Sequence, residues 1–162
     1  MKIAYNLNKE EAKKLEEEIK LNGGHCLCAV QKSMDTKCMC KEFRDKINEG
    51  YFGPCACGLY KSIPTIVYIY GNMYYVEDFL QWNAYFSQRG MIVLLPGRLG
   101  QSQPDNLEAS NNLININTQK IQFSDIVFII DKYGKIDEIT DKVIKEAKKS
   151  GKKILFASEM DD

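Results

Sequence analysis

Six cysteines lie in one short stretch of this 162-residue chain, as three Cys-x-Cys pairs between residues 26 and 57. Thiolates are soft ligands that bind iron–sulfur clusters and zinc, and they exchange with disulfides. Side chains two positions apart in an extended chain point to opposite sides. Each pair therefore offers one sulfur to a site and leaves the other facing away, unless the backbone turns. Three pairs can supply four ligands to a metal centre and keep two sulfurs close by.

The number and spacing of the cysteines bear on which metal they would hold. Four thiolates match either a 4Fe-4S cluster or a tetrahedral zinc ion. Zinc modules favour gaps of two to four residues, whereas every gap within a pair here is one residue, and six cysteines exceed the four that zinc takes. We therefore expect an iron–sulfur cluster or a comparable metal site, with structural zinc and an unmetallated thiol cluster as the alternatives.

The composition is typical of a soluble globular protein. Hydrophobic residues make up 44% of the chain, charged residues 27%, and the formal net charge is zero. A neutral chain gives no electrostatic case for a nucleic-acid or membrane partner, and no apolar run approaches the ~20 residues that span a bilayer. The start is rich in Glu and Lys and lacks the apolar segment of a signal peptide. We expect a cytoplasmic protein, in which clustered thiols serve metal or redox chemistry.

The elements that position the cysteines are expected to be helical. Residues 9–22 are predicted to form a helix with exposed Glu/Lys pairs that ends at a Gly-Gly pair. A short helix is predicted at residues 41–50, between the second and third pairs, with Phe43 and Ile47 on its apolar side. Residues 1–62 are thus predicted to be a small helical, cysteine-rich module.

The pattern changes in residues 63–162, where short apolar, β-branched segments alternate with segments of helical periodicity. Strands that alternate with helices form parallel sheets covered on both faces, so this part is predicted to be a small Rossmann-like α/β domain. The expected strands cover residues 64–71, 91–97, 124–131 and 152–158, the expected helices cover 76–90, 112–122 and 137–151, and a polar loop covers 98–112.

The cysteine segment, with CLC, CMC and CAC followed by GLY, resembles the catalytic chain of ferredoxin:thioredoxin reductase over roughly residues 10–62. The resemblance implies that Cys28 and Cys57 form a redox-active disulfide, reduced in two one-electron steps through a 4Fe-4S cluster. A ferredoxin-like protein would donate the electrons and a thiol protein would receive them. The resemblance also implies four cluster ligands, namely Cys26, Cys38, Cys40 and Cys55.

The segment departs from that family at the residue between the cysteines of each pair. The family has Pro, Pro and His, whereas this chain has Leu27, Met39 and Ala56. In the family the histidine lies beside the disulfide and assists proton transfer. His25 is the one histidine of this chain. Because the chain keeps all six cysteines but lacks this histidine, the sequence leaves open whether it is an oxidoreductase that acts on disulfides.

Residues 64–156 resemble the nucleoside 2-deoxyribosyltransferase-like proteins. The matching stretches are YIYGNMYYVEDF, GMIVLLPG, QKIQFSDIVFIID and YGKIDEITDKVIKEAKKSGKKI. In that family the loops at the carboxyl ends of the strands bind a nucleoside or nucleotide, as open parallel sheets generally do. Tyr74 is an aromatic candidate to stack on the base. The resemblance places five residues at this site, namely Gly71, Asn72, Pro96, Gly97 and Asp125.

The second resemblance also has a chemical departure. Family transferases attack the sugar with a glutamate of the last helix, but Val143 stands at that position and Glu146 follows three residues later. We therefore expect a pocket that binds a nucleotide without cleaving it. A nucleoside hydrolase or transferase that uses Asp137 or Glu146 is a lesser alternative. By analogy with the family, a homo-oligomer is left open.

The two parts together predict an iron–sulfur redox protein of the disulfide-reductase kind, fused to a catalytically degenerate nucleotide-binding domain. The rival interpretation is a nucleotide sensor or sequestering protein whose cysteines hold a structural metal, because a first part of about sixty residues is too small to form a sufficient core alone.

Overall fold

A computed structural model describes residues 1–97 and 106–160 of the chain. The chain forms two compact units, Met1–Pro64 and Thr65–Asp162. The boundary predicted from the sequence lies between residues 62 and 63. Each unit has its own buried apolar residues and is described by itself.

The first unit combines helices with a small antiparallel sheet. Its elements are β1 (Lys2–Tyr5), α1 (Lys9–Leu21), a 3-10 turn η1 (Met34–Thr36), α2 (Lys41–Asn48), β2 (Gly53–Pro54) and β3 (Tyr60–Ile63). The strands lie in the order β1–β3–β2, and Tyr5 stacks on its cross-strand partner Tyr60 with ring centroids 5.3 Å apart. Both predicted helices are present, but the sheet was not predicted, so a purely helical module is not confirmed. The strands are too short to show a period in the sequence, and β1 pairs with a segment at the far end of the unit.

The helices of this unit pack in one core with the cysteines. Helix α1 begins at Asn8, whose side chain accepts hydrogen bonds from the backbone of Glu10 and Glu11, as a good N-cap does. Apolar faces of α1 and α2 then meet in one core together with three cysteines. The buried members are Ala12, Ile19, Cys26, Cys40, Phe43, Cys55 and Leu59.

The second unit is a four-stranded parallel sheet flanked by helices, which confirms the α/β prediction at that level. All four predicted strands are present, in the order β5–β4–β6–β7. The elements are β4 (Ile66–Gly71), α3 (Val76–Ser87), β5 (Ile92–Leu94), α4 (Leu107–Phe123), β6 (Ile126–Ile130), α5 (Glu138–Lys149) and β7 (Lys153–Phe156).

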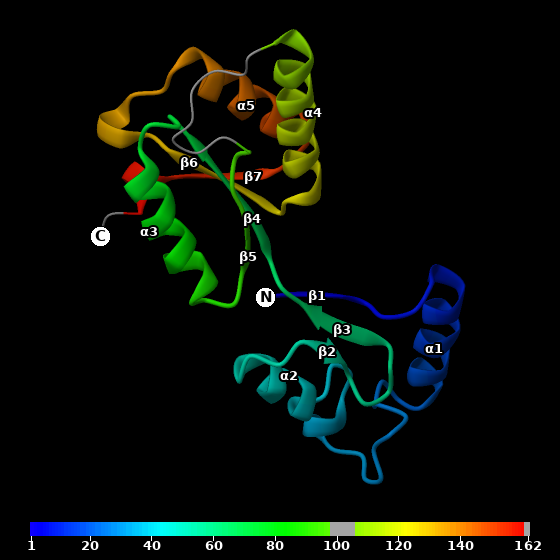
Figure 1. The fold of residues 1–162 in the computed structure, drawn as a ribbon. Helices are drawn as coiled ribbons and strands as arrows, with labels where there is room; N and C mark the ends of the chain where they lie inside the picture. The colour runs from blue at the N-terminus through cyan, green and yellow to red at the C-terminus, as the bar shows by residue number, and fades with distance from the viewer. Residues whose placement is uncertain (98–105, 161–162) are drawn as a thin grey trace. The chain divides into compact units, whose positions relative to one another are not determined.

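Side chains alternate between the two faces of this sheet, as the pleat of a strand requires. Val67 and Ile69 of β4 pack with Phe79 of α3, whereas Tyr68 and Tyr70 pack in the cluster formed with α4 and α5. Figure 1 shows the same division, with α3 on one side of the sheet and α4 and α5 on the other. Both faces of the strands are buried, which explains their continuous apolar sequences.

Helix α4 begins earlier than the sequence predicts. The polar stretch 98–112 is expected to be a loop, but Leu107 already starts the helix. Asn106 is its N-cap, and its side-chain oxygen accepts a hydrogen bond of 2.8 Å from the backbone of Ala109. The rest of the expected loop, 98–105, lies outside the described residues. Along the two described stretches, no helix is long and apolar enough to cross a membrane.

Candidate functional site

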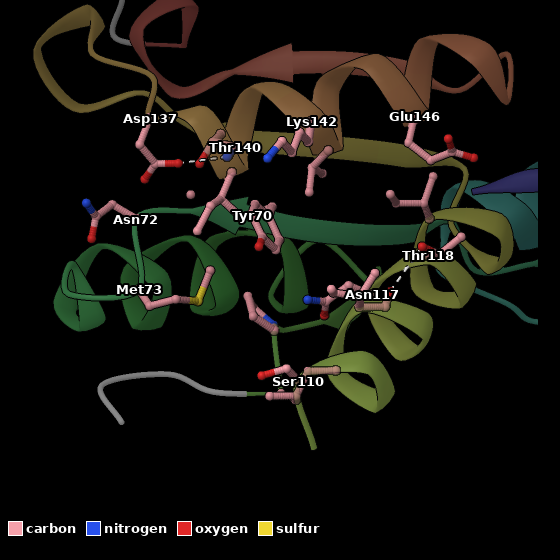
Figure 2. A pocket seen from close by; sticks show the side chains of 18 of the residues that line it. Tyr70, Asn72, Met73, Ser110, Asn117, Thr118, Asp137, Thr140, Lys142 and Glu146 are labelled. Carbon is pink, nitrogen blue, oxygen red and sulfur yellow. Dashed lines mark hydrogen bonds between the residues drawn. The ribbon is translucent and has the colours of Figure 1, made fainter. Parts of the chain in front are cut away.

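A cavity of about 490 Å³ opens in the second unit where β4 ends, between α4 and α5. Figure 2 shows Asp137, the residue before α5, with Thr140 and Lys142 of α5 on one side of it and residues of α4 on the other. The lining is mostly apolar with a few polar groups, as is usual for small-molecule sites. It consists of Tyr70, Gly71, Asn72, Met73, Tyr74, Pro96, Gly97, Ser110, Leu113, Ile114, Asn117, Thr118, Ile121, Asp137, Ile139, Thr140, Lys142, Val143 and Glu146.

Tyr70 lies at the floor of the cavity and is only 5% exposed. Its hydroxyl makes no hydrogen bond to any residue that the structure describes, whereas the hydroxyl of the neighbouring Tyr68 donates to Oδ1 of Asn117 at 2.9 Å. Burial, and then the charge of Asp137, raise the pKa of Tyr70. The phenol therefore keeps its proton at neutral pH and can donate a hydrogen bond. Buried polar groups are normally hydrogen-bonded, which makes this hydroxyl a candidate contact for a molecule in the cavity.

The raised pKa values predict a loss of stability in alkali. Burial also raises the pKa of Tyr68 above its ordinary value, so both folded tyrosines hold protons that the unfolded chain releases near pH 10. The two tyrosines thus contribute their full stabilisation below pH 10. As the pH rises further, the free energy of unfolding of this unit falls by up to about 1.4 kcal/mol per pH unit for each tyrosine.

Urea unfolding followed by the emission of Trp82, the single tryptophan of the chain, tests this prediction. A double variant, Tyr68→Phe with Tyr70→Phe, should lose less stability than the native chain between pH 9 and pH 11. Tyr133→Phe, at a residue 84% exposed, is the matched control and should follow the native chain. Equal alkaline loss in all three proteins would contradict the assignment.

Two polar side chains at the cavity accept hydrogen bonds from the backbone. Asp137 is the N-cap of α5, and its Oδ1 accepts a hydrogen bond of 2.7 Å from the backbone of Thr140. Oδ1 of Asn72 accepts a hydrogen bond of 3.0 Å from the backbone of Tyr74. Both side chains therefore shape the loops, and their remaining polar atoms stay at the cavity edge, where Figure 2 shows them.

Five of the predicted ligand residues, Gly71, Asn72, Tyr74, Pro96 and Gly97, line the cavity. The structure gives one of them a further reason to be glycine. A Cβ at Gly71 would lie 2.8 Å from the carbonyl oxygen of Ile130, its cross-strand partner. The close approach of β4 and β6 thus requires glycine at this position, whatever the ligand.

Asp125 is placed elsewhere, and this corrects its expected role in the site. It precedes β6 at the amino ends of the strands and does not line the cavity. Its Oδ2 accepts a hydrogen bond of 2.9 Å from the backbone of Ile66, and its own backbone N–H donates to the carbonyl of Ile66 at 2.8 Å. Asp125 therefore fixes the start of β4 against the start of β6, at the edge of the sheet opposite to the cavity.

The α4 wall of the cavity is absent from the sequence-based site. Ser110, Asn117 and Thr118 point to the cavity from α4, seven and eight residues apart, which is two turns of a helix. That spacing is a usable signal, but only once residues 107–111 are known to be helical. Glu146 also lines the cavity, as does Val143, the residue that the sequence resemblance aligns with the transferase nucleophile.

In the first unit, burial differs among the six thiols, which are all free. Cys26, Cys40 and Cys55 are buried in the core, Cys38 is partly buried beside them, and Cys57 is also partly buried. Cys28 is exposed. The first pair thus places one sulfur inside and one outside, although its backbone turns, with the N–H of Ala29 donating to the carbonyl of Cys26 at 3.1 Å.

The buried sulfurs influence one another. Burial raises the pKa of Cys26, and the neighbouring charges of Cys40 and Cys38 raise it further. Burial likewise raises the pKa of Cys57 to about 11, although a backbone hydrogen bond from Leu59 opposes the shift. These thiols keep their protons at neutral pH as long as no cation compensates the negative charge, whereas a bound metal would displace the protons.

The sulfurs of the first unit are not arranged as the ligands of a metal ion usually are. In residues 1–97 and 106–160, no three His, Cys, Asp or Glu side chains are placed so as to hold an ion. The donors have the right chemistry, since soft thiols gather in one core, but they are not directed at a common point, so metal binding would require their side chains to turn.

Comparison with known proteins adds no assignment. No protein-family model matches the chain, and no curated protein matches it. Both resemblances of the sequence therefore remain expectations.

Proposed function

We propose that the second unit binds a nucleoside or nucleotide in the cavity at the end of β4. The buried Tyr70 hydroxyl, which no described residue satisfies, carries this proposal, because such a group calls for a ligand atom. The cavity volume of about 490 Å³ lies within the range of small-molecule sites. Its place at the carboxyl ends of parallel strands, in a Rossmann-like strand order, is where open α/β sheets bind ligands.

The lining suits a flat, partly polar ligand. Met73, Leu113 and Ile139 provide apolar surface for a base, and the Tyr70 hydroxyl and the Asn117 side-chain amide provide hydrogen bonds. Val143 supplies no carboxylate where transferases carry their nucleophile. Binding without release of the base is therefore the expected behaviour, as a nucleotide sensor or sequestering protein requires.

Filling the cavity should weaken binding strongly. Ser110 faces the cavity from α4, so Ser110→Trp places an indole in the space meant for the ligand. Asn111→Trp is the matched control, because Asn111 lies on the same helix, is exposed and does not line the cavity. Calorimetry with deoxynucleosides and their 5′-phosphates should show binding that Ser110→Trp weakens at least about tenfold and Asn111→Trp leaves intact. No binding across the whole panel, or equal binding by both variants, would refute the proposal.

The Tyr70 hydroxyl should contribute directly to affinity. Tyr70→Phe removes one hydrogen bond worth about 0.5–1.5 kcal/mol and should weaken binding roughly 2- to 13-fold, without changing the apolar contacts. Tyr133→Phe changes an exposed tyrosine outside the cavity and should have no effect. The same calorimetric titration measures both variants. Unchanged affinity in Tyr70→Phe would mean that the phenol does not contact the ligand.

A second candidate function concerns the first unit, which we propose holds a thiolate-bound metal centre, either a 4Fe-4S cluster or zinc. The burial pattern favours it, because Cys26, Cys40 and Cys55 share one core with Cys38, whereas Cys28 stays outside. A cluster would supply one-electron chemistry for disulfide reduction with a ferredoxin-like donor, and zinc would stabilise the fold. Cys28 would then be the sulfur that a thiol partner can reach.

Metal analysis of protein purified without oxygen tests the second candidate. Iron with absorbance near ~400 nm would identify a cluster, and one zinc per chain would identify a structural site. Cys40→Ser should lower the metal content several-fold, while Cys28→Ser, the matched change at the exposed cysteine, should leave it unchanged. Protein free of both metals would rule this function out and would leave the ligand-binding proposal untouched.

A further inference from the structure

The third cysteine pair is folded differently from an extended Cys-x-Cys pair. A turn closes over residues 55–58, in which the backbone N–H of Gly58 donates to the carbonyl of Cys55 at 2.9 Å and Gly58 has a φ of +78°. This turn brings the sulfurs of Cys55 and Cys57 to the same side, 3.5 Å apart. An extended chain would point them in opposite directions.

A backbone donor holds the buried sulfur of this pair in place. The N–H of Tyr60 donates to Sγ of Cys55 at 3.3 Å. This contact keeps Cys55 beside Cys57, so the two sulfurs are already placed for a bond to form between them.

The two sulfurs differ in access. Cys55 is 8% exposed, whereas Cys57 is only partly buried. An external reagent therefore reaches Cys57 first, and Cys55 lies within contact distance to react next. This division of roles, one accessible sulfur and one adjacent resolving sulfur, is common in redox-active cysteine pairs.

We propose that Cys55 and Cys57 are a redox-active dithiol that forms its own disulfide, without Cys28, by exchange with a low-molecular-weight disulfide. The Cys57 thiolate attacks the external disulfide, forms a mixed disulfide and releases one external thiolate, which takes up the proton that Cys57 lost. The Cys55 thiolate then attacks the mixed disulfide at Sγ of Cys57 and releases the second external thiolate, which takes up the proton that Cys55 lost. The dithiol is oxidised by two electrons, and one external disulfide is reduced to two thiols.

This inference is independent of the cavity ligand and differs from the pairing of Cys28 with Cys57 that the sequence resemblance implies. It also bears on the proposed metal centre, because a sulfur of Cys55 that binds a metal cannot enter a disulfide. Oxidation of the pair and metal binding at Cys55 therefore exclude each other. The experiment has to treat the protein both as purified and after removal of metal by a chelator.

Trypsin separates the three pairs, which makes the linkage readable by mass spectrometry. Cleavage after Lys20, Lys32, Lys37, Lys41, Lys46 and Lys61 puts each Cys-x-Cys pair in a different peptide, namely 21–32, 38–41 and 47–61. The full chain is reduced, incubated with increasing ratios of oxidised to reduced glutathione, quenched with N-ethylmaleimide and digested. We expect peptide 47–61 to lose two hydrogens and to escape alkylation, with no cross-link to 21–32.

Matched serine variants separate the roles of the sulfurs. Cys28→Ser should change the glutathione ratio at half-oxidation by less than about twofold, while Cys55→Ser should abolish the internal link and leave a glutathione adduct on Cys57. A cross-link between 21–32 and 47–61, or full alkylation of 47–61 at every ratio both before and after chelation, would overturn the proposal. A link that forms only after chelation supports it and shows that metal protects Cys55.

Discussion

Phe128→Ala should lower the free energy of unfolding of the α/β unit by about 3–5 kcal/mol, as expected for removal of a large buried aromatic ring. Phe128 is completely buried in the middle strand β6. Its ring lies 4.5 Å from that of Trp82 and 5.0 Å from that of Phe86, measured between centroids. Because these partners stand on α3, the cavity left by alanine would loosen the contact between that helix and the sheet.

Phe123→Ala is the matched control, since it removes the same side chain from a residue 69% exposed at the end of α4. It should change stability by no more than about 0.5 kcal/mol. Trp82 is the single tryptophan, so its emission during urea unfolding reports on this unit alone. Similar losses in the two variants would show that Phe128 does not hold α3 against β6.

Gly71→Val should be almost as damaging, with an expected cost of at least about 3 kcal/mol, at the upper end of overpacking effects. The added Cβ would lie 2.8 Å from the backbone oxygen and 2.9 Å from the Cβ of Ile130. Backbone atoms of a central strand cannot move aside as a flexible side chain can. The two strands must separate at the cavity floor, so ligand binding should be lost as well.

Gly97→Val tests the same change at the other glycine of the cavity. Among the described residues, a Cβ there would meet the tip of the Leu113 side chain, at 3.0 Å, and a leucine methyl can rotate away. We expect a loss below about 1 kcal/mol, measured by the same Trp82 unfolding experiment. Equal destabilisation by the two valines would mean that the spacing between β4 and β6 does not determine the glycine at 71.

Local patterns in the sequence were sufficient to predict much of the second unit. Apolar runs such as IVYIYG and IVFII identify buried strands, since both of their faces lie against helices. The loops after β4 and β5 follow directly from the strand ends, so five of the six predicted ligand residues lie at one cavity. Parallel strands gather their carboxyl ends at one edge, and chain order alone therefore places these loops together.

Other features depend on partners far along the chain. The Asp125 carboxylate bonds the backbone of Ile66, and no local signal distinguishes this strand-pairing role from a place in the ligand site. Strand β1 pairs with β3 at the opposite end of the first unit, and its four residues carry too little periodicity to reveal a sheet. The α4 residues that line the cavity were not predicted, because the first turn of α4 was assigned to a loop. Its N-cap, Asn106, is a residue type that is also common in loops.

The sequence by itself determined the order of helices and strands in the α/β unit, the identity of the loops at the carboxyl edge of its sheet and the chemistry of the cysteines. These properties depend on residue type and short-range periodicity, which the chain carries in every conformation. Only the tertiary structure decided which thiols are buried and that Cys55 and Cys57 meet across a turn. It alone also shows that Tyr70 lacks an internal partner among the described residues. Burial and side-chain direction arise when distant segments pack, and no short stretch of sequence contains that information.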